Sequence, residues 1–291
     1  MFGTNEIVGK SFFKTQAKDT LAVTSMFFTL QGEGPFAGLP ALFIRLAKCN
    51  LACNFCDTYF DQGTTMTFSE IVDKMLSTVE DFFEGKSSPY DNIVLVITGG
   101  EPLLQSNLTA FIKEVFMLFS EVQVESNGIP STEIPEGVTL VCSPKCAEKD
   151  GVATKYLAPS KTMLERADCL KFVMSADPAS PYSCVPSWAF QWAKDYENRP
   201  GSKGPGTIYV SPMNVYNQIP HRAKLLRAQK TSPDAELTFI ERSTVDEVIS
   251  FWEPGLLDLK KNQENHEYTA RYCLNNGLRF NMQMHLFASL A

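Results

Sequence analysis

The chain has 291 residues, of which 44% are hydrophobic and 20% are charged, and its formal net charge is -7. This length allows one large domain with a full hydrophobic core or two small ones, and the composition is ordinary for a globular protein. The sequence has no block of basic residues and no apolar run of membrane-spanning length, which argues against a nucleic-acid partner and against a membrane.

The start of the chain and its cysteines indicate a reducing compartment. Residues 1–20 have no continuous apolar core and no cleavage-site pattern, so we expect no signal peptide and a cytoplasmic location. A chain of this length can build its core without disulfides, so we expect its eight cysteines to be free. Three of them share one loop. Five are expected to be ordinary core or loop thiols: Cys142, Cys146, Cys169, Cys184 and Cys273.

Short apolar, β-rich runs alternate with helical patterns along the chain. Helices are predicted over 67–83, where Thr67 and Glu70 have the spacing of a capping box, and over 103–119, with shorter ones within 187–199 and 265–276. Strands are predicted over 41–47, 92–100, 122–128, 139–145, 169–177, 207–214 and 278–284. Strands that alternate with helices form a parallel sheet that is buried on both faces. We therefore predict an α/β fold, an incomplete TIM-type βα barrel of about six parallel strands with its active site at the C-terminal strand ends.

We predict one catalytic domain over residues 21–291, preceded by an N-terminal extension over residues 1–20. Residues 146–168 and 215–265 contain proline, lysine and mixed charge without a clear period. They are predicted to be loops and lid-like insertions with some helix inside them.

Polar and glycine-rich motifs follow the predicted strands. TGGEP (98–102), ESNG (125–128), SPK (143–145) and SPMN (211–214) each fall where a strand ends, and a loop with three cysteines follows the first strong strand. In parallel α/β folds the carboxyl ends of the strands carry the active site. The sequence therefore predicts that one site collects all of these motifs.

The cysteine loop places Cys49, Cys53 and Cys56 in the spacing C-x3-C-x2-C. Structural zinc prefers four tetrahedral ligands, usually as two pairs, and Cys142 and Cys146 offer only a poor second pair. Thiolates are the normal ligands of a 4Fe-4S cluster, which needs four ligands to fill all its irons. Three thiolates thus favour a cluster with one iron open to a small molecule, and a zinc module remains the alternative.

The same spacing resembles the radical S-adenosylmethionine (SAM) superfamily. The resemblance implies that SAM binds the open iron and is cleaved to a 5′-deoxyadenosyl radical, with Phe55 near adenine. In TGGEP, Gly100 allows a close backbone approach and Glu101 is an acceptor for the SAM ammonium. At the next strand ends, polar groups suit the ribose and methionine of SAM, although a residue of this kind taken alone is more often part of a capped turn than a ligand: Glu125, Ser126, Asn127, Ser143 and Lys145. The resemblance adds the strand end at Ser211, Pro212, Met213 and Asn214.

Residues 27–58, which include LQGEG, closely resemble the 7-carboxy-7-deazaguanine synthases. The likeness continues through TGGEPLL, ESNG, SPK, LKFV, SPMN and the ending RFNMQMHLFASLA, but it does not cover residues 1–20 or most of 215–265. It implies a lyase that converts 6-carboxy-5,6,7,8-tetrahydropterin to 7-carboxy-7-deazaguanine with loss of ammonia, as in queuosine biosynthesis. The implied steps are hydrogen removal from C6 of the pterin and contraction of its six-membered ring.

The resemblance also assigns residues to the substrate. Arg45 and Glu33 are predicted to be catalytic, and a guanidinium such as that of Arg45 pairs a carboxylate in bidentate fashion, although a structural salt bridge is equally open. Thr58 is the implied ligand of a Mg2+ ion that also binds substrate, or else a capping residue in a turn. The further implied substrate contacts are Leu30, Gln31, Gly32, Thr98 and the terminal carboxylate of Ala291.

Two positions depart from the family pattern, which usually has glycine at Lys48 and often has tryptophan at Phe55. The resemblance further implies a homodimer and an electron donor such as flavodoxin or ferredoxin. The alternatives are a glycyl-radical-type activase that acts on a protein partner and a non-catalytic iron–sulfur or zinc module. QGEG together with Arg45 fits a small carboxylated ring and favours the pterin.

Overall fold

The computed structural model describes residues 5–9, 11–86, 92–202, 204–217, 255–288 and 290. The strands of its main sheet are β1 (Thr20–Leu30), β2 (Pro40–Leu46), β3 (Thr64–Thr67), β4 (Val94–Gly99), β5 (Glu121–Ser126), β6 (Thr139–Cys142), β9 (Cys169–Met174), β10 (Thr207–Pro212) and β11 (Arg279–Phe280). Within the described residues they form a nine-stranded sheet in the order β11-β10-β9-β6-β5-β4-β2-β1-β3.

Most of this sheet is parallel. Every neighbouring pair from β2 to β11 runs parallel, whereas β1 pairs antiparallel with both β2 and β3. The predicted α/β class with a mostly parallel central sheet is therefore confirmed.

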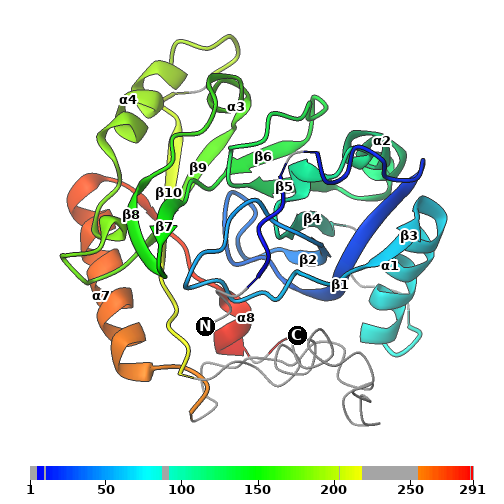
Figure 1. The fold of residues 1–291 in the computed structure, drawn as a ribbon, viewed down its shortest axis with the longest axis horizontal. Helices are drawn as coiled ribbons and strands as arrows, with labels where there is room; N and C mark the ends of the chain where they lie inside the picture. The colour runs from blue at the N-terminus through cyan, green and yellow to red at the C-terminus, as the bar shows by residue number, and fades with distance from the viewer. Residues whose placement is uncertain are drawn as a thin grey trace.

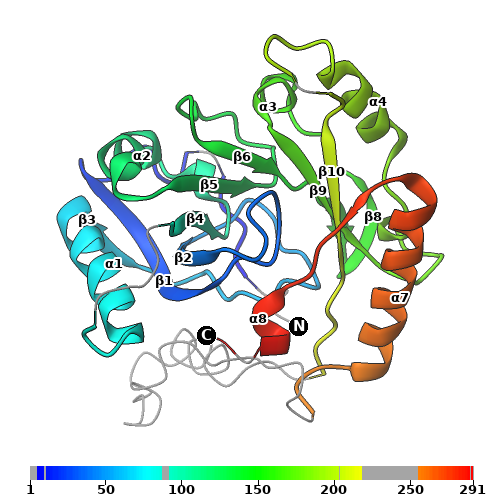
Figure 2. The same cartoon turned by 180° about the vertical axis from the view of Figure 1, so that it is seen from behind.

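Helices cover the outside of the sheet. They are α1 (Phe68–Phe82), α2 (Leu108–Val115), α3 (Lys161–Arg166), α4 (Ser187–Tyr196), α7 (Leu259–Asn276) and α8 (Met284–Ala288), with 3-10 turns η1 (Pro102–Leu104), η2 (Phe116–Leu118) and η3 (Pro181–Ser183). Figures 1 and 2 show α1 and α2 beside one end of the sheet and α4 and α7 beside the other. Among the described residues, no helix is long and apolar enough to cross a membrane.

The hydrophobic core has two main parts. One lies between the strands from β1 to β6 and helices α1 and α2, with Leu42, Ile97 and Phe111 fully buried. The other joins β9 and β10 to α4 and includes Phe172 and Trp192. Because both faces of the central strands are covered, the sequences of these strands are continuous apolar runs.

The start of α1 was predicted correctly, whereas α7 begins at Leu259, six residues before the helix predicted over 265–276. Helix α1 begins after Thr67 with the predicted capping box, in which the Thr67 Oγ1 accepts from the Glu70 amide and the Glu70 carboxylate accepts from the Thr67 amide. The helix predicted over 103–119 is instead η1, α2 and η2. The break falls at Gln105, which has an extended backbone and whose side chain is hydrogen-bonded to both backbone groups of Ala22 on β1.

Strand β1 was not predicted from the sequence because Thr24, Ser25 and Thr29 interrupt its apolar run, although eight of its eleven residues are buried. Residues 146–168 contain a two-stranded antiparallel hairpin of β7 (Cys146–Lys149) and β8 (Val152–Tyr156), followed by α3. Most of the predicted insertion at 215–265 lies outside the described residues.

Candidate active site

A cavity lies at the carboxyl ends of the parallel strands and collects most of the predicted site residues. Those that line it are Gln31, Gly32, Glu33, Arg45, Cys49, Cys53, Phe55, Cys56, Thr58, Thr98, Gly100, Glu125, Ser126, Asn127, Ser143, Lys145, Ser211, Pro212 and Asn214. Leu30, Glu101 and Met213 do not line the cavity, and Ala291 lies outside the described residues. Segments from β1 to the C-terminal residues 283–285 therefore meet around one space.

The three thiols of the cysteine loop face this cavity. Burial raises the pKa of Cys49 to about 12 and that of Cys53 to about 11, so without a metal both are protonated at neutral pH. Within the described parts of the chain, no three His, Cys, Asp or Glu side chains converge on one metal-ion position. Structural zinc needs four ligands around a single ion, whereas a cubane distributes its thiolates over separate irons. Three thiols that line one cavity match the thiolate donors of a 4Fe-4S cluster.

The β7–β8 hairpin holds one side of the cysteine loop. The Asn54 amide donates to both carboxylate oxygens of Glu148 at 2.9 Å, and the Asn54 side chain donates to the Gly151 carbonyl at 2.9 Å. The Phe55 ring packs edge-on against Tyr182, with 5.1 Å between ring centroids. The insertion predicted over residues 146–168 thus helps to support the cysteine loop.

The glycines of TGGEP approach the backbone of the cysteine loop itself. A Cβ atom on Gly100 would lie 1.9 Å from the Lys48 carbonyl oxygen, and the Glu101 amide donates to that oxygen at 2.8 Å. Sequence reasoning attributed these glycines to a close ligand approach. The structure adds that the turn could not pack on the loop with larger residues.

Glu101 lies beneath the cavity, with 1% of its surface exposed. Its carboxylate accepts from the amides of Leu103 and Asn127 and from the Ser126 hydroxyl, at 2.7–3.0 Å. Burial nevertheless raises its pKa to about 7. These contacts join the ends of β4 and β5, and the predicted role of Glu101 as an acceptor for the SAM ammonium stays a prediction.

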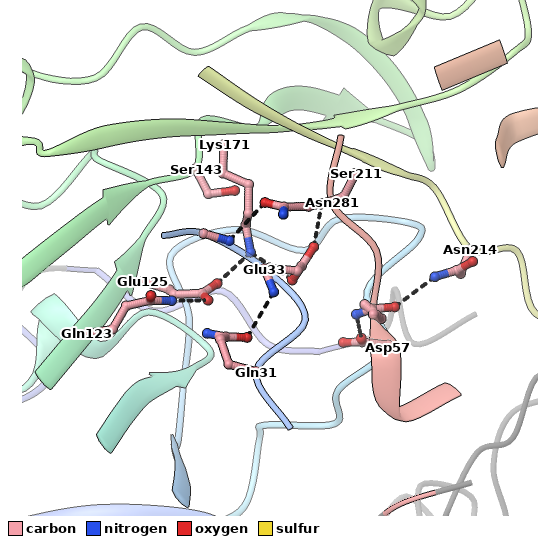
Figure 3. A network of polar contacts seen from close by, with 12 residues as sticks. Gln31, Glu33, Asp57, Gln123, Glu125, Ser143, Lys171, Ser211, Asn214 and Asn281 are labelled. Atoms are coloured by element: carbon pink, nitrogen blue, oxygen red, sulfur yellow. Dashed lines mark hydrogen bonds and ion pairs between the residues drawn. The ribbon is translucent and has the colours of Figure 1, made fainter. Parts of the chain in front are cut away.

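A buried charge network crosses the cavity (Figure 3). The Lys171 ammonium lies 2.9 Å from Glu33 Oε2 and is also paired with Glu125, and the side chains of the three residues are 7–16% exposed. Ser211 donates to the other carboxylate oxygen of Glu33. Burial opposes the charge on Glu33, but Lys171 and the Ser211 hydroxyl outweigh it and lower the pKa of this carboxyl. Glu33 is therefore ionised at neutral pH.

A second polar group surrounds Arg45 and Thr58. Burial alone would raise the pKa of Asp57, but Arg45 and a hydrogen bond from the Gln283 amide, at 2.7 Å, lower it below its ordinary value. The Thr58 hydroxyl donates to Asp57 at 3.0 Å. The Arg45 guanidinium lies 4.9 Å above the Phe27 ring and makes no hydrogen bond or ion pair within the described residues. Its planar fork is thus available to a ligand carboxylate.

Comparison with known proteins identifies the family, although no family model matches the chain. A 7-carboxy-7-deazaguanine synthase from Rhodospirillum rubrum is 32% identical over 193 residues, which cover 66% of this chain and 73% of that protein. The chain belongs to the 7-carboxy-7-deazaguanine synthase family. A member from Bacteroides thetaiotaomicron is 34% identical over 58% of this chain and 78% of its own, and one from Rickettsia prowazekii is 37% identical over 57% and 66%.

A solved structure shows that this fold is known. The crystal structure of QueE from Escherichia coli matches with a TM-score of 0.51, covering 96% of this chain and 99% of that one at 18% sequence identity. At this level of identity the likeness concerns the fold. The family assignment therefore depends on the sequence matches, and the fold agrees with it.

In this member of the synthase family, Gln31 presents an unsatisfied donor at the cavity. Its side-chain oxygen accepts from the Glu33 amide at 3.1 Å, which orients the amide group. Its Nε2 is buried and has no hydrogen-bond partner among the described residues. Because a buried unpaired donor is costly, such a group indicates a ligand acceptor at this position.

Replacing Gly32 by alanine is expected to displace the C-terminal segment 281–288 from the LQGEG turn. The new Cβ atom would lie 2.3 Å from the Met282 carbonyl oxygen and 2.6 Å from the Met284 amide nitrogen, and backbone cannot yield as a side-chain tip can. We expect the free energy of unfolding, measured by urea titration, to fall by about 1–3 kcal/mol. Gly9→Ala, where a Cβ meets no atom within 4 Å, is the control. Equal stability of both variants would contradict this packing.

Several residues that line the cavity were not predicted from the sequence, among them the polar residues Asp57, Lys171, Tyr216 and Gln283. A signal for Lys171 existed, because a lysine inside the apolar strand CLKFVM must be paired if the strand is buried on both faces. Asp57 lies next to the last cysteine of the loop, so it could have been predicted as a site residue together with Thr58. Nothing local marks Gln283, which reaches the cavity only through the return of the C-terminal segment.

Proposed function

We propose that this chain is a 7-carboxy-7-deazaguanine synthase, a carbon–nitrogen lyase that converts 6-carboxy-5,6,7,8-tetrahydropterin to 7-carboxy-7-deazaguanine with loss of ammonia. The observation that carries the proposal is one cavity that combines three cluster-type thiols with the Arg45 guanidinium and the Gln31 Nε2, neither of which has a hydrogen-bond partner among the described residues. Membership of the synthase family supports the same conclusion.

The site would hold three groups. Cys49, Cys53 and Cys56 would bind the 4Fe-4S cluster, and the strand ends around Ser126, Ser143, Lys145 and Ser211–Asn214 would bind SAM. When bound, the cluster and SAM would together supply a 5′-deoxyadenosyl radical. Thr58 and the neighbouring ionised Asp57 offer hard oxygen donors of the kind that Mg2+ prefers.

The chain's own residues would position the pterin. Arg45 would pair its carboxylate, and Gln31 Nε2 would donate to a ring acceptor. Glu33, held ionised by Lys171 and Ser211, would accept hydrogen bonds from pterin N–H groups, rather than act as an acid. Three directional contacts on a flat ring fix which C–H bond faces the radical, and such positioning is the main contribution of the protein.

The remaining predictions belong to the same proposal. The main sheet has two edges, β3 and β11, among the described residues, which supports an incomplete barrel. We place the catalytic domain at residues 21–291 with residues 1–20 as an extension. The family resemblance implies a homodimer and a flavodoxin or ferredoxin as electron donor, and the cysteine usage favours a cytoplasmic location.

An anaerobic assay tests the function. The chain is reconstituted with iron and sulfide and supplied with SAM, dithionite, Mg2+ and the carboxylated tetrahydropterin, and the product is followed by mass spectrometry. We expect a product mass that corresponds to loss of ammonia. Formation of 5′-deoxyadenosine with the pterin untouched would reject the substrate and favour an activase. A chain that binds only zinc and never cleaves SAM would reject the enzyme altogether.

Replacing Arg45 by lysine is expected to lower kcat/KM for the pterin about 30- to 100-fold, since an ammonium cannot form the bidentate carboxylate pair. The amount of bound cluster should not change. Arg271→Lys is a matched control, because Arg271 pairs with Glu267 on the exposed face of α7. Equal kinetics for the two variants would show that Arg45 does not bind the substrate carboxylate.

A further inference from the structure

The N-terminal residues 5–9 and 11–13, which we call the N-terminal clamp, pack against the two ends of the cysteine loop. The Asn5 side chain donates to the Thr58 carbonyl at 2.9 Å and accepts from the Phe60 amide at 3.2 Å. The Val8 amide donates to the Cys49 carbonyl at 2.9 Å. Asn5 is 6% exposed, so these contacts are protected from water. One short segment thus contacts the residues on both sides of the three thiols.

Lys48, which directly precedes the first cysteine, has a left-handed backbone with φ of +71°. Its amide donates to the Phe60 carbonyl at 2.7 Å, and its carbonyl accepts from the Glu101 amide at 2.8 Å. These bonds hold both sides of the residue in a conformation that is costly for any side chain with a Cβ. The conformation also explains why glycine would suit this position.

The N-terminal clamp binds the side chain that this conformation projects. The Lys48 ammonium lies 3.6 Å from Glu6 Oε2 and 5.6 Å from the centre of the Phe12 ring, and its side chain is 17% exposed. An ion pair and a cation–π contact on one partly buried lysine both favour the observed backbone.

The clamp is itself anchored to the body of the protein. Phe13 is buried together with Val8 and Leu104. The Ser106 hydroxyl donates to the Phe13 carbonyl at 2.9 Å. Leu104 and Ser106 lie just after TGGEP. The anchor therefore lies beside the end of β4, where the Glu101 amide donates to the Lys48 carbonyl.

We propose that the N-terminal clamp holds the cysteine loop in its cluster-binding geometry. Asn5 is a positioning residue that binds the loop at Thr58 and Phe60, after the three thiols. Glu6 and Phe12 act on the other end of the loop through Lys48. The proposal rests on the proposed cluster at Cys49, Cys53 and Cys56, but not on the pterin substrate. Ordering both ends of a loop in advance lowers the entropy lost when the loop binds its cluster.

The first test replaces Asn5 by alanine, with the exposed Asn198→Ala as the matched control. In the reconstituted protein we expect the rate of cluster loss to an iron chelator, followed by visible absorbance, to rise about tenfold. In the cluster-free protein we expect faster hydrogen–deuterium exchange of the amides of residues 48–60. If neither quantity differs from the Asn198→Ala control, the clamp does not position the loop.

The second test asks whether Phe12 acts through Lys48. Phe12→Ala should speed cluster loss severalfold in the natural sequence but have no effect in a Lys48→Gly background, where the backbone needs no side-chain support. Glu84→Gly, at another left-handed position with φ of 53°, is the control background, and there Phe12→Ala should keep its effect. The same effect in all three backgrounds would overturn the role of Lys48.

The two proposals can fail separately. If the natural sequence takes up zinc but never a cluster, the proposed function fails, while amide exchange of the cluster-free chain still decides whether the clamp orders residues 48–60. If the cluster forms and turns over normally but exchange and cluster loss are insensitive to Asn5, the clamp fails and the function stands.

Discussion

Replacing Lys171 by methionine is expected to lower the free energy of unfolding by about 3–5 kcal/mol at neutral pH, the usual effect of removing one partner from a buried ion pair. Lys171 is the cation that the structure places between Glu33 and Glu125, and its own side chain is 7% exposed. Methionine fills a similar volume, so the loss would come from the two carboxylates left without a partner. Urea titration of the cluster-free protein measures it.

The deficit of the Lys171→Met variant should shrink as the pH falls. In the natural protein the pKa of Glu33 is lowered, so this pair contributes stability above the ordinary value of 4.5 and loses it as the pH falls through the folded pKa. In the variant, burial still raises the pKa of Glu33 while the opposing ammonium is gone. Protonation then relieves the buried charge, and the stability of the variant rises toward that of the natural protein below neutral pH.

Two further variants make this prediction specific. Lys194→Met removes an exposed lysine on α4 and should leave the free energy of unfolding within about 0.5 kcal/mol of the natural protein. Adding Glu33→Gln to Lys171→Met removes one of the unpaired charges and should recover part of the loss. A constant deficit between pH 5 and pH 8, or no recovery in the double variant, would show that the network is not held by charge.

Replacing Gly100 by alanine is expected to reduce cluster content to less than about a tenth of that of the natural sequence. The added Cβ atom would lie 1.9 Å from the carbonyl oxygen of Lys48 and 3.1 Å from the Cys49 amide nitrogen. Because these are backbone atoms, the cysteine loop must move away from the end of β4. The cost should be about 3 kcal/mol of stability, at the upper end of ordinary overpacking, and iron analysis after reconstitution gives the cluster content.

Gly206→Ala separates this loop displacement from general destabilisation. A Cβ at Gly206 would lie 2.6 Å from the Trp192 ring, so this variant is also overpacked, but in the core beneath α4. We expect it to lose stability while it keeps its cluster. If both glycine variants lose cluster in proportion to their stability, the contact between Gly100 and Lys48 has no special part in forming the site.

The features that could be predicted from the sequence depend on residues that lie close together along the chain. The capping box of Thr67 and Glu70 spans four residues and directly specifies the start of α1. The cysteine spacing and the TGGEP turn are equally local, and the strand-end rule then brings them to the same edge of the sheet. Apolar runs predicted the parallel strands, because strands that are covered on both faces need no polar alternation.

The tertiary structure alone decided which side chains meet inside the cavity. Lys171 contacts Glu33 across 138 residues, Ser211 contacts Glu33 across 178, and Gln283 contacts Asp57 across 226. The support of the cysteine loop by Asn5 and Glu148 also joins separate segments. Local propensity and spacing determined that this chain would form βα units and present three thiols at one rim. The partners of those thiols and charges followed only once the sheet order was set, because burial and pairing energies depend on neighbours in space.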